Sequence, residues 1–414
     1  MKVLLVNPVR QKMMPVHIPV RLGVLYSIGE MLGEQLSLGD LDAHREDDSP
    51  EAIRRDLKLA EWDLIHFSVD FDQYKHFRQI APIFRKQLPN VAMSASGEVV
   101  DNLPRQFMKL NSEVDVVIFG NQERAFTELM ARVEHKRWEL VPCSAYRDKE
   151  EILLTDRLDY GTEDVQGLPF PAYGYIPLDV YWHFSAIFPF SSEAMTCKRR
   201  LSFLWERGNV RPGVDRAIEN IRYCAFRYRI DFANILDKGF MADRKWLDMF
   251  LERYMEEELN EVVPFSCVAD PKTVTDSGLI RSLKDAGCKF VELSLKGDNE
   301  LVKGAVDSLT KVGINAHLTT EIGKPEQTFK DILDLTDFIS KSKWGVDVNL
   351  FRQMPSDDWK DASYLEKYLE DYADPNPRVH FSKFDFGSLL AIQRLVQAKD
   401  VDKLRELGSF HTWS

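Results

Sequence analysis

The feature that most constrains this sequence is an alternation of short apolar runs with longer amphipathic segments, which occurs twice along the chain. In residues 1–138, the apolar runs at 3–6 (VLLV), 63–69 and 115–119 are typical of buried strands. Between such runs, residues 20–32 repeat apolar side chains at helical spacing. Strands that alternate with helices predict a parallel, doubly wound sheet, whose ligands bind at the carboxyl ends of the strands.

The alternation returns in residues 196–355, where residues 290–295 and 316–322 are typical strands and residues 299–312 a typical helix. About five or six strand–helix units of this kind predict a partial (β/α) barrel. Residues 139–195 are rich in proline and aromatic residues, and we interpret them as a connector. Residues 356–414 are charged and predict a helical C-terminal region. The predicted fold class is therefore α/β, with a Rossmann-like domain followed by a partial barrel.

The composition excludes several classes of partner. The 414 residues carry a formal net charge of -12, which disfavours binding to nucleic acid or to anionic membranes through their phosphates. No apolar run approaches the ~18 residues of a membrane span, and the N-terminus does not resemble a signal peptide. We therefore expect a cytoplasmic protein. The five cysteines are scattered, which predicts reduced thiols rather than a disulfide framework.

Short motifs in the first 138 residues resemble the cobalamin-binding domain of class B radical-SAM enzymes. They are Asn7-Pro8, residues 20–26 (VRLGVLY), Phe67-Ser68, Ser96-Gly97 and the run Gly120-Asn121-Gln122-Glu123. Glycine lets a backbone approach a large flat ligand closely, and serine or asparagine can donate hydrogen bonds to it. The alternative is a domain of this fold that is kept only as a scaffold. The residues that the resemblance places around cobalamin are Asn7, Leu22, Gly23, Ser68, Asp70, Ser96, Gly97, Gly120, Asn121 and Glu123.

A departure from this family falls at the start of the partial barrel. Active radical-SAM enzymes carry Cys-x-x-x-Cys-x-x-Cys there, whose three thiolates hold a four-iron cluster that binds S-adenosylmethionine. The matching positions in this chain are Cys197, Leu201 and Leu204. Because such clusters are held by several thiolates, one cysteine cannot replace three. A second motif, which often has an acid that contacts S-adenosylmethionine, reads Lys296-Gly297-Asp298 here. The resemblance therefore implies neither an iron–sulfur cluster nor a protein-bound metal, and it makes S-adenosylmethionine binding doubtful.

The predicted barrel strand at residues 316–322 carries candidate catalytic groups. Its alternate residues His317, Thr319 and Glu321 share one face. If that face points into the barrel, His317 and Glu321 form an acid–base pair at the old active site. The alternative is that the same face packs against a helix.

Three functional hypotheses follow from the resemblance and its departures. The first is cobalamin-dependent chemistry, without radical-SAM activity, on a small metabolite bound between the domains. The cofactor would then supply the reactivity and the protein would orient it. The second is an inactive partner or regulatory subunit of an active radical-SAM homologue. The third is a barrel reused for cofactor-free acid–base chemistry.

Overall fold

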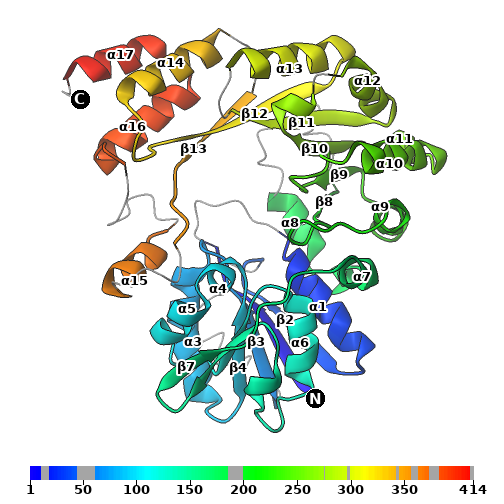
Figure 1. Ribbon diagram of the computed structural model, residues 1–414, viewed down its shortest axis with the longest axis vertical. Coiled ribbons are helices and arrows are strands. Elements are labelled where there is room, and N and C mark those ends of the chain that lie inside the picture. Colours follow the sequence, from blue (N-terminus) through cyan, green and yellow to red (C-terminus); the bar gives the residue numbers. More distant parts are fainter. Residues whose placement is uncertain are drawn as a thin grey trace. The chain divides into compact units, whose positions relative to one another are not determined.

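The protein divides into two compact units, Met1–Ser185 with Met354–Val379, and Ala186–Gln353 with His380–Ser414. The structure is a computed structural model (Figure 1). It describes residues 1–10, 18–43, 61–184, 199–274, 276–295, 299–341, 345–355, 362–372 and 382–410.

The first unit is built on a seven-stranded sheet with the order β2-β1-β3-β4-β5-β6-β7. The first five of these strands in that order are parallel, which confirms the predicted Rossmann-like sheet. The last two pair antiparallel as a hairpin at one edge. The strands are β1 (Lys2–Asn7), β2 (Gln35–Asp40), β3 (Leu64–Ser68), β4 (Ala92–Ser96), β5 (Val116–Ile118), β6 (Ser144–Asp148) and β7 (Glu151–Leu154).

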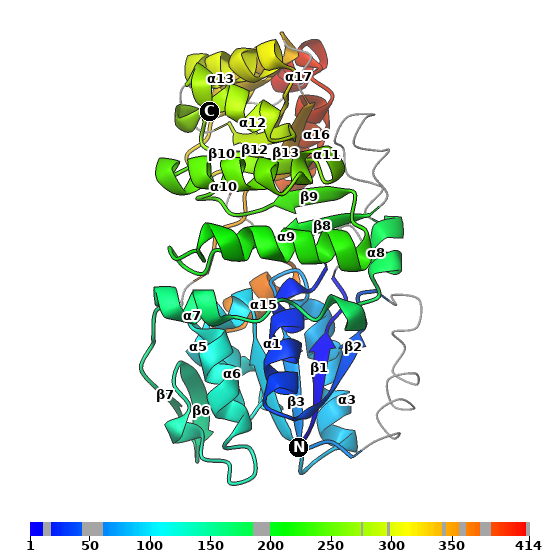
Figure 2. The same ribbon diagram turned by 90° about the vertical axis from the view of Figure 1, so that its right-hand side faces the viewer.

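Helices cover both faces of this sheet (Figure 2), which is why its central strands are almost continuously buried. Between strand and helix layers, aromatic rings such as Phe67, Phe77 and Phe107 pack edge to face or tilted. The helices are α1 (Val20–Met31), α3 (Tyr74–Gln87), α4 (Glu98–Asn102), α5 (Pro104–Leu110), α6 (Gln122–Met130), α7 (Thr162–Gly167) and α8 (Leu178–Phe184).

A helix from much later in the chain completes the core of this unit. Helix α15 (Ala362–Glu370) packs on α3 and α5. Its Leu365 and Leu369 are fully buried in the same apolar core. At its edge, Arg78 of α3 forms an ion pair with Glu366 at 2.7 Å. The C-terminal region is therefore divided between the two units.

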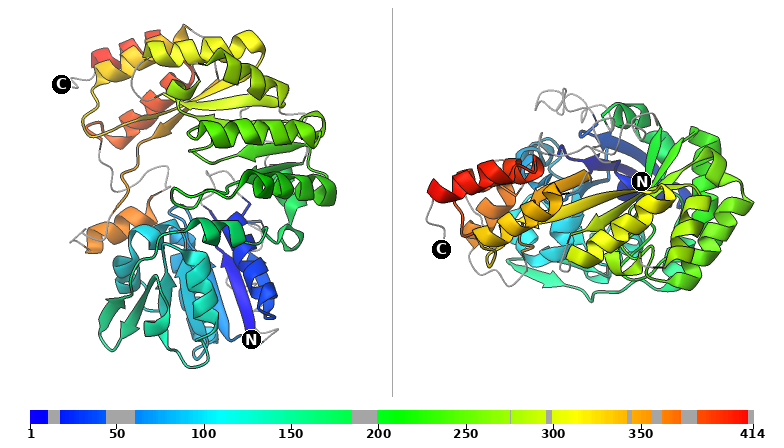
Figure 3. Two further views of the ribbon diagram at one scale, coloured as in Figure 1. Left: turned by 45° about the vertical axis from the view of Figure 1, so that its right-hand side comes forward. Right: turned by 90° about the horizontal axis from the view of Figure 1, so that it is seen from above.

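The second unit contains six parallel strands in the order β13-β12-β11-β10-β9-β8, curled into a half-barrel. Helices run along its outer side (Figures 1 and 3), as the predicted partial barrel requires. The strands are β8 (Arg200–Phe203), β9 (Phe232–Ile235), β10 (Phe265–Ala269), β11 (Cys288–Ser294), β12 (Asn315–Ile322) and β13 (Gly345–Leu350). The helices are α9 (Val214–Tyr228), α10 (Arg244–Glu256), α11 (Leu259–Val262), α12 (Ser277–Asp285), α13 (Asn299–Val312) and α14 (Phe329–Ser340).

The edge strand β13 is covered by α16 (Phe386–Gln397), and α17 (Val401–Phe410) packs on α14. Two glutamines of α16 bind the backbone of β13 directly. Gln393 Nε2 donates to the Val348 carbonyl at 2.7 Å, and the Val348 amide donates to Gln397 Oε1 at 2.8 Å. These bonds satisfy strand groups that would otherwise form an open sheet edge.

Some predicted boundaries differ from the observed ones. The sequence pattern also predicts a strand over 38–42 and a helix over 79–88; the observed elements are β2 at Gln35–Asp40 and α3, which begins at Tyr74. The hairpin β6–β7 lies in the segment that we interpret as a connector. The sequence does not predict it, because its two strands are short and partly exposed. Ser49 and Pro50 are typical of a helix start and predict a helix through Leu59, but this segment lies outside the described residues. No helix among the described ranges is long and apolar enough to cross a membrane.

Candidate functional site

The carboxyl ends of the strands in the first unit carry a buried polar network centred on Asn7. Asn7 Nδ2 donates to Asp40 Oδ1 at 2.8 Å and to the Tyr181 hydroxyl at 3.3 Å. Gln73 Nε2 donates to Asn7 Oδ1 at 2.7 Å. Tyr181 in turn donates to Asp40 at 2.8 Å. The amide of Asn7, predicted to contact a cofactor, therefore ties together β1, β2 and α8.

Beside this network lies an ion-pair cluster centred on Arg10. Its guanidinium donates to both carboxylate oxygens of Asp72 at 2.7 and 2.8 Å, and to Asp70 Oδ2 at 2.9 Å. Burial alone would raise the pKa of Asp70, but the charges of Arg10 and Arg21 outweigh it and lower that pKa. Asp70, predicted as a cofactor contact, is thus a fixed anion at the strand ends. Ser68, at the end of β3, is half-buried next to it.

Ser96, at the end of β4, is bonded to a histidine inside the sheet. His66 of β3 contacts Ser96 Oγ through Nε2 at 2.9 Å and Ser94 Oγ through Nδ1 at 2.8 Å. Complete burial lowers the pKa of His66 to about 3, so the ring is neutral at physiological pH. The predicted cofactor contact Ser96 therefore uses its hydroxyl within the core.

Two predicted ligand-binding glycines allow the chain to approach itself. Gly97 has φ +109°, and a Cβ there would lie 2.5 Å from the Val69 carbonyl oxygen. Gly120 has φ +66°, and a Cβ there would lie 3.3 Å from the Leu158 carbonyl oxygen. Both positions thus need glycine for the crossing of neighbouring loops.

Leu22 and Gly23 serve the packing of α1. Leu22 is buried, and a Cβ on Gly23 would lie 3.0 Å from Pro171 Cβ. The Ala172 amide donates to the Gly23 carbonyl at 2.9 Å. This glycine therefore lets the segment before α8 lie against the helix.

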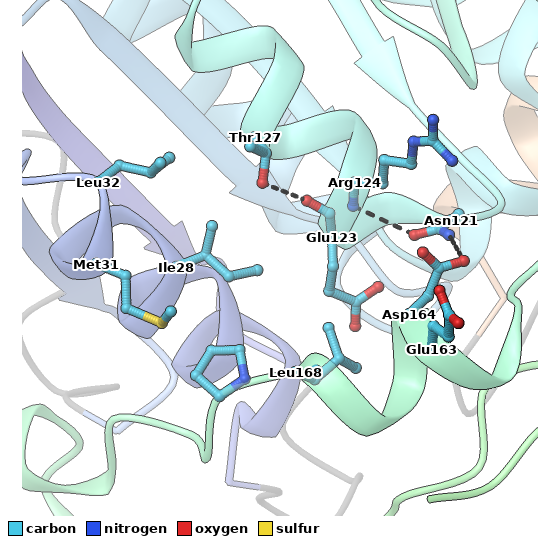
Figure 4. A pocket seen from close by; sticks show the side chains of 12 residues that line it. Ile28, Met31, Leu32, Asn121, Glu123, Arg124, Thr127, Glu163, Asp164 and Leu168 are labelled. Atoms are coloured by element: carbon cyan, nitrogen blue, oxygen red, sulfur yellow. Dashed lines mark hydrogen bonds between the residues drawn. The ribbon is translucent and has the colours of Figure 1, made fainter.

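Asn121 and Glu123 line a pocket of about 350 Å³ between α1, α6 and α7 (Figure 4). Asn121 caps α6, since its Oδ1 accepts from the Arg124 amide at 3.2 Å, and its Nδ2 donates to Asp164 at 3.2 Å. The Tyr160 hydroxyl donates to Glu123 Oε2 at 2.5 Å. The lining residues are Ile28, Met31, Leu32, Asn121, Glu123, Arg124, Thr127, Glu163, Asp164, Gly167, Leu168 and Pro169.

In the second unit, the stretch predicted as a cluster loop is partly a strand. Leu201 lies inside β8 and is fully buried, and Leu204 directly follows that strand, half-buried. Cys197 lies outside the described residues. The loop from Leu204 to Gly213, between β8 and α9, contains no cysteine.

The described cysteines of this unit are buried thiols. Burial raises the pKa of Cys224, while a hydrogen bond with Cys288, followed by burial, raises that of Cys267. Metal binding needs the thiolate, which these environments disfavour. Among the described ranges, no group of three or more His, Cys, Asp or Glu side chains is placed to hold a metal ion.

A buried carboxylate holds the loop after β8. Asp237, which follows β9, accepts hydrogen bonds from the amides of Trp205 at 2.9 Å and Glu206 at 3.0 Å. Burial raises the pKa of Asp237 to about 6. The Gly239 amide donates to Glu206 at 3.2 Å, so the two loops are bound to each other in both directions.

Polar side chains of β11, β12 and β13 form a second network. Glu292 and His317 are register partners, as are Thr319 and Asp347. His317 Nε2 lies 2.9 Å from Asp347 Oδ2. A Cβ on Gly345 would lie 2.9 Å from His317 Nδ1, so this glycine leaves room for the ring.

The observed partner of His317 thus differs from the predicted one, Glu321. His317 and Glu321 are four residues apart on one strand, which separates them by about 13 Å, whereas neighbouring strands lie about 4.8 Å apart. A carboxylate on the neighbouring strand is therefore closer to the imidazole than one on the same strand. Glu321 is instead in register with Asn349.

A pocket of about 570 Å³ lies at the carboxyl ends of β9 to β12, and Glu292 and Thr319 line it. Burial raises the pKa of Glu292; His317 opposes this, Asp347 adds to it, and Thr319 and Lys238 oppose it. The lining residues are Lys238, Val268, Ala269, Asp270, Pro271, Lys272, Glu292, Ser294, Leu301, Val302 and Thr319.

No family model matches the sequence, and no curated protein matches it significantly. Solved structures do match. TsrM from Kitasatospora setae, a radical S-adenosylmethionine methyltransferase solved with tryptophan and a SAM analogue, superposes with a TM-score of 0.68 at 14% identity, over 84% of this chain and 73% of TsrM. This chain has the fold of cobalamin-dependent radical-SAM enzymes.

Two further structures support the same fold. TsrM with cobalamin and a [4Fe-4S] cluster gives a TM-score of 0.66 at 14% identity, over 84% of this chain and 72% of TsrM. The cobalamin-dependent S-adenosylmethionine radical enzyme OxsB gives 0.64 at 14% identity, and the match covers 89% of this chain but 55% of OxsB.

The sequence did not reveal Asp347, Glu292, Lys238 or the Arg10 cluster. Glu292 had a detectable signal, because it is an acid between the apolar residues Val291 and Leu293 of one strand. Asp347 has the same local pattern, between Val346 and Val348, but its contact with His317 depends on the order of β12 and β13 in the sheet.

Proposed function

We propose that this protein binds cobalamin in its first unit, carries no iron–sulfur cluster, and performs cobalamin-dependent chemistry on a small metabolite without radical-SAM activity. The observation that supports cobalamin is the fold, which matches a cobalamin-bound enzyme over 84% of the chain. Because neither unit makes up 84% of the chain, the match includes residues of both units.

Three groups at the strand ends suit the amide-bearing corrin ring. The Arg21 side chain is 41% exposed, and Asp70 is a fixed anion beside it. Burial and the charge of Asp70 raise the pKa of Glu98 to about 7. Carboxylates and a guanidinium can accept from and donate to amides. Asn7, Ser96, Gly97 and Gly120 would then shape this edge indirectly, through the contacts they make within the unit. Cobalamin would supply the cobalt reactivity, and these residues would hold and orient it.

The cluster-free part of the proposal rests on the cysteines. Leu201 is buried within β8, and the loop that follows this strand has no thiol. Cys224, Cys267 and Cys288 are buried. Three convergent thiolates are therefore not available from the described residues.

The test is an absorption spectrum with cobalt and iron analysis, after incubation with hydroxocobalamin and desalting. We expect corrin bands at about one cobalt per chain with no stoichiometric iron. Asp70→Asn should lower the retained cobalt, and Asp285→Asn, an exposed carboxylate of α12, should not. Absence of retained corrin would refute the cobalamin proposal and leave the partner-subunit hypothesis, to be tested by pull-down. Stoichiometric iron with a broad cluster absorbance would refute the cluster-free part.

A further inference from the structure

The half-barrel brings a carboxyl group, a hydroxyl group and two ammonium groups to one pocket. Glu292 and Thr319 line the pocket from adjacent strands, and Lys238 and Lys272 line it from the loops after β9 and β10. Fully buried Leu293 and Leu318 occupy the other face of the same strands. The polar groups are therefore a distinct face at the carboxyl ends of the strands, where barrel folds place their active sites.

Glu292 has the environment of a proton-transfer group. The titratable neighbours that act on its pKa are His317 from β12, Asp347 from β13 and Lys238 after β9. Burial makes it a stronger base than an exposed glutamate, because its pKa is raised. The hydrogen bond that Asp347 accepts from His317 fixes the orientation of the imidazole, which lies next to Glu292 in register. His317 and Asp347 thus act through Glu292, as positioning residues.

We propose that this pocket is a cofactor-independent proton-transfer site, in which Glu292 removes and returns a proton on the carbon beside a carbonyl of an anionic hydroxy-carbonyl compound. The electron pair of the broken C–H bond forms the C=C bond of an enediolate, and the carbonyl oxygen takes the negative charge. The Lys238 ammonium stabilises that oxygen, the Thr319 hydroxyl donates to the Glu292 carboxylate and orients it, and Lys272 binds the anionic substituent. Return of the proton restores the carbonyl, so the step needs no oxidant or reductant.

Incubation of the full-length protein with dihydroxyacetone phosphate or fructose 6-phosphate in D₂O tests this site. We expect deuterium to enter the carbon beside the carbonyl, detected by mass spectrometry. Glu292→Gln should slow the exchange about 100-fold or more. Asp285→Asn should leave the rate unchanged. No exchange with either compound, or equal rates for wild type and Glu292→Gln, would overturn the proposal.

The pH profile of the exchange separates catalysis from a structural effect. The midpoint of the rise of the exchange rate with pH should lie above the ordinary glutamate pKa, because burial raises the pKa of Glu292. His317→Gln should raise it further, because His317 lowers the pKa of Glu292, whereas Asp347→Asn should lower it. Lys272→Met should raise KM, because this lysine binds the anionic substituent, and Lys289→Met, at the opposite end of β11, should not. Midpoints that do not move in these opposite directions would contradict the assigned roles, even in variants whose thermal unfolding is unchanged.

Discussion

The neutral, buried His66 should make the first unit sensitive to acid. Its pKa is about 3 when folded, while an unfolded histidine titrates near 6.5. As the pH falls below 6.5, the imidazole of the unfolded chain binds a proton, whereas the buried imidazole of the folded chain does not. The stability that is present above pH 6.5 is therefore progressively lost down to pH 3. Each pKa unit is worth about 1.4 kcal/mol, which gives a loss of about 2 kcal/mol between pH 7 and pH 5.

His66→Gln removes this titration and keeps one donor and one acceptor. Because the protein has two units, urea unfolding should be followed by pulsed hydrogen exchange of peptides from β3 and β4, which report on the first unit. Between pH 7 and pH 5, the variant should lose about 2 kcal/mol less free energy of unfolding than the wild type, since the other groups titrate alike in both chains. His135→Gln, at an exposed position of the same unit, is the matched control. Equal losses in wild type and His66→Gln would refute the reasoning.

Two further substitutions test the packing of this unit. Gly97→Ala should cost about 2–4 kcal/mol, because the new methyl group would meet a backbone carbonyl at a strained φ, whereas Gly167→Ala, with no atom within 4 Å of its Cβ, should be nearly neutral; urea unfolding measures both. Leu369→Ala should lower stability by about 2–5 kcal/mol, because it empties a fully buried site between α15 and the rest of the unit. An unchanged midpoint for Leu369→Ala would show that α15 is not part of that core.

The predictable part of the fold was the part with long periodic patterns. The strands β1, β3, β11 and β12 and the helices α1 and α13 have apolar spacing that fixes their type. The hairpin β6–β7 was missed because its strands are only five and four residues long and are partly exposed. β8 was missed for the same reason, since it has four residues, including Arg200 and Ser202.

The site was less predictable than the fold, since side-chain partners come from different strands. Alternation correctly placed His317 and Thr319 on one face, but the carboxylate that reaches His317 belongs to the next strand. Similarly, the glycines at strand ends were found from their motifs. Their contacts with Val69 and Leu158 depend on loop crossings that no local pattern encodes.

The return of α15 to the first unit has a consequence for synthesis of the chain. A ribosome must make the 168 residues from Ala186 to Gln353 before this helix can reach the core that it covers. At about 5–20 residues per second, that interval lasts roughly 8–35 s. During this time the apolar surface of α3 and α5 is not yet covered by α15. A fragment that ends at Ser185 would leave this surface exposed permanently. Expression of the first unit alone therefore requires that the segment containing α15 be fused to residues 1–185.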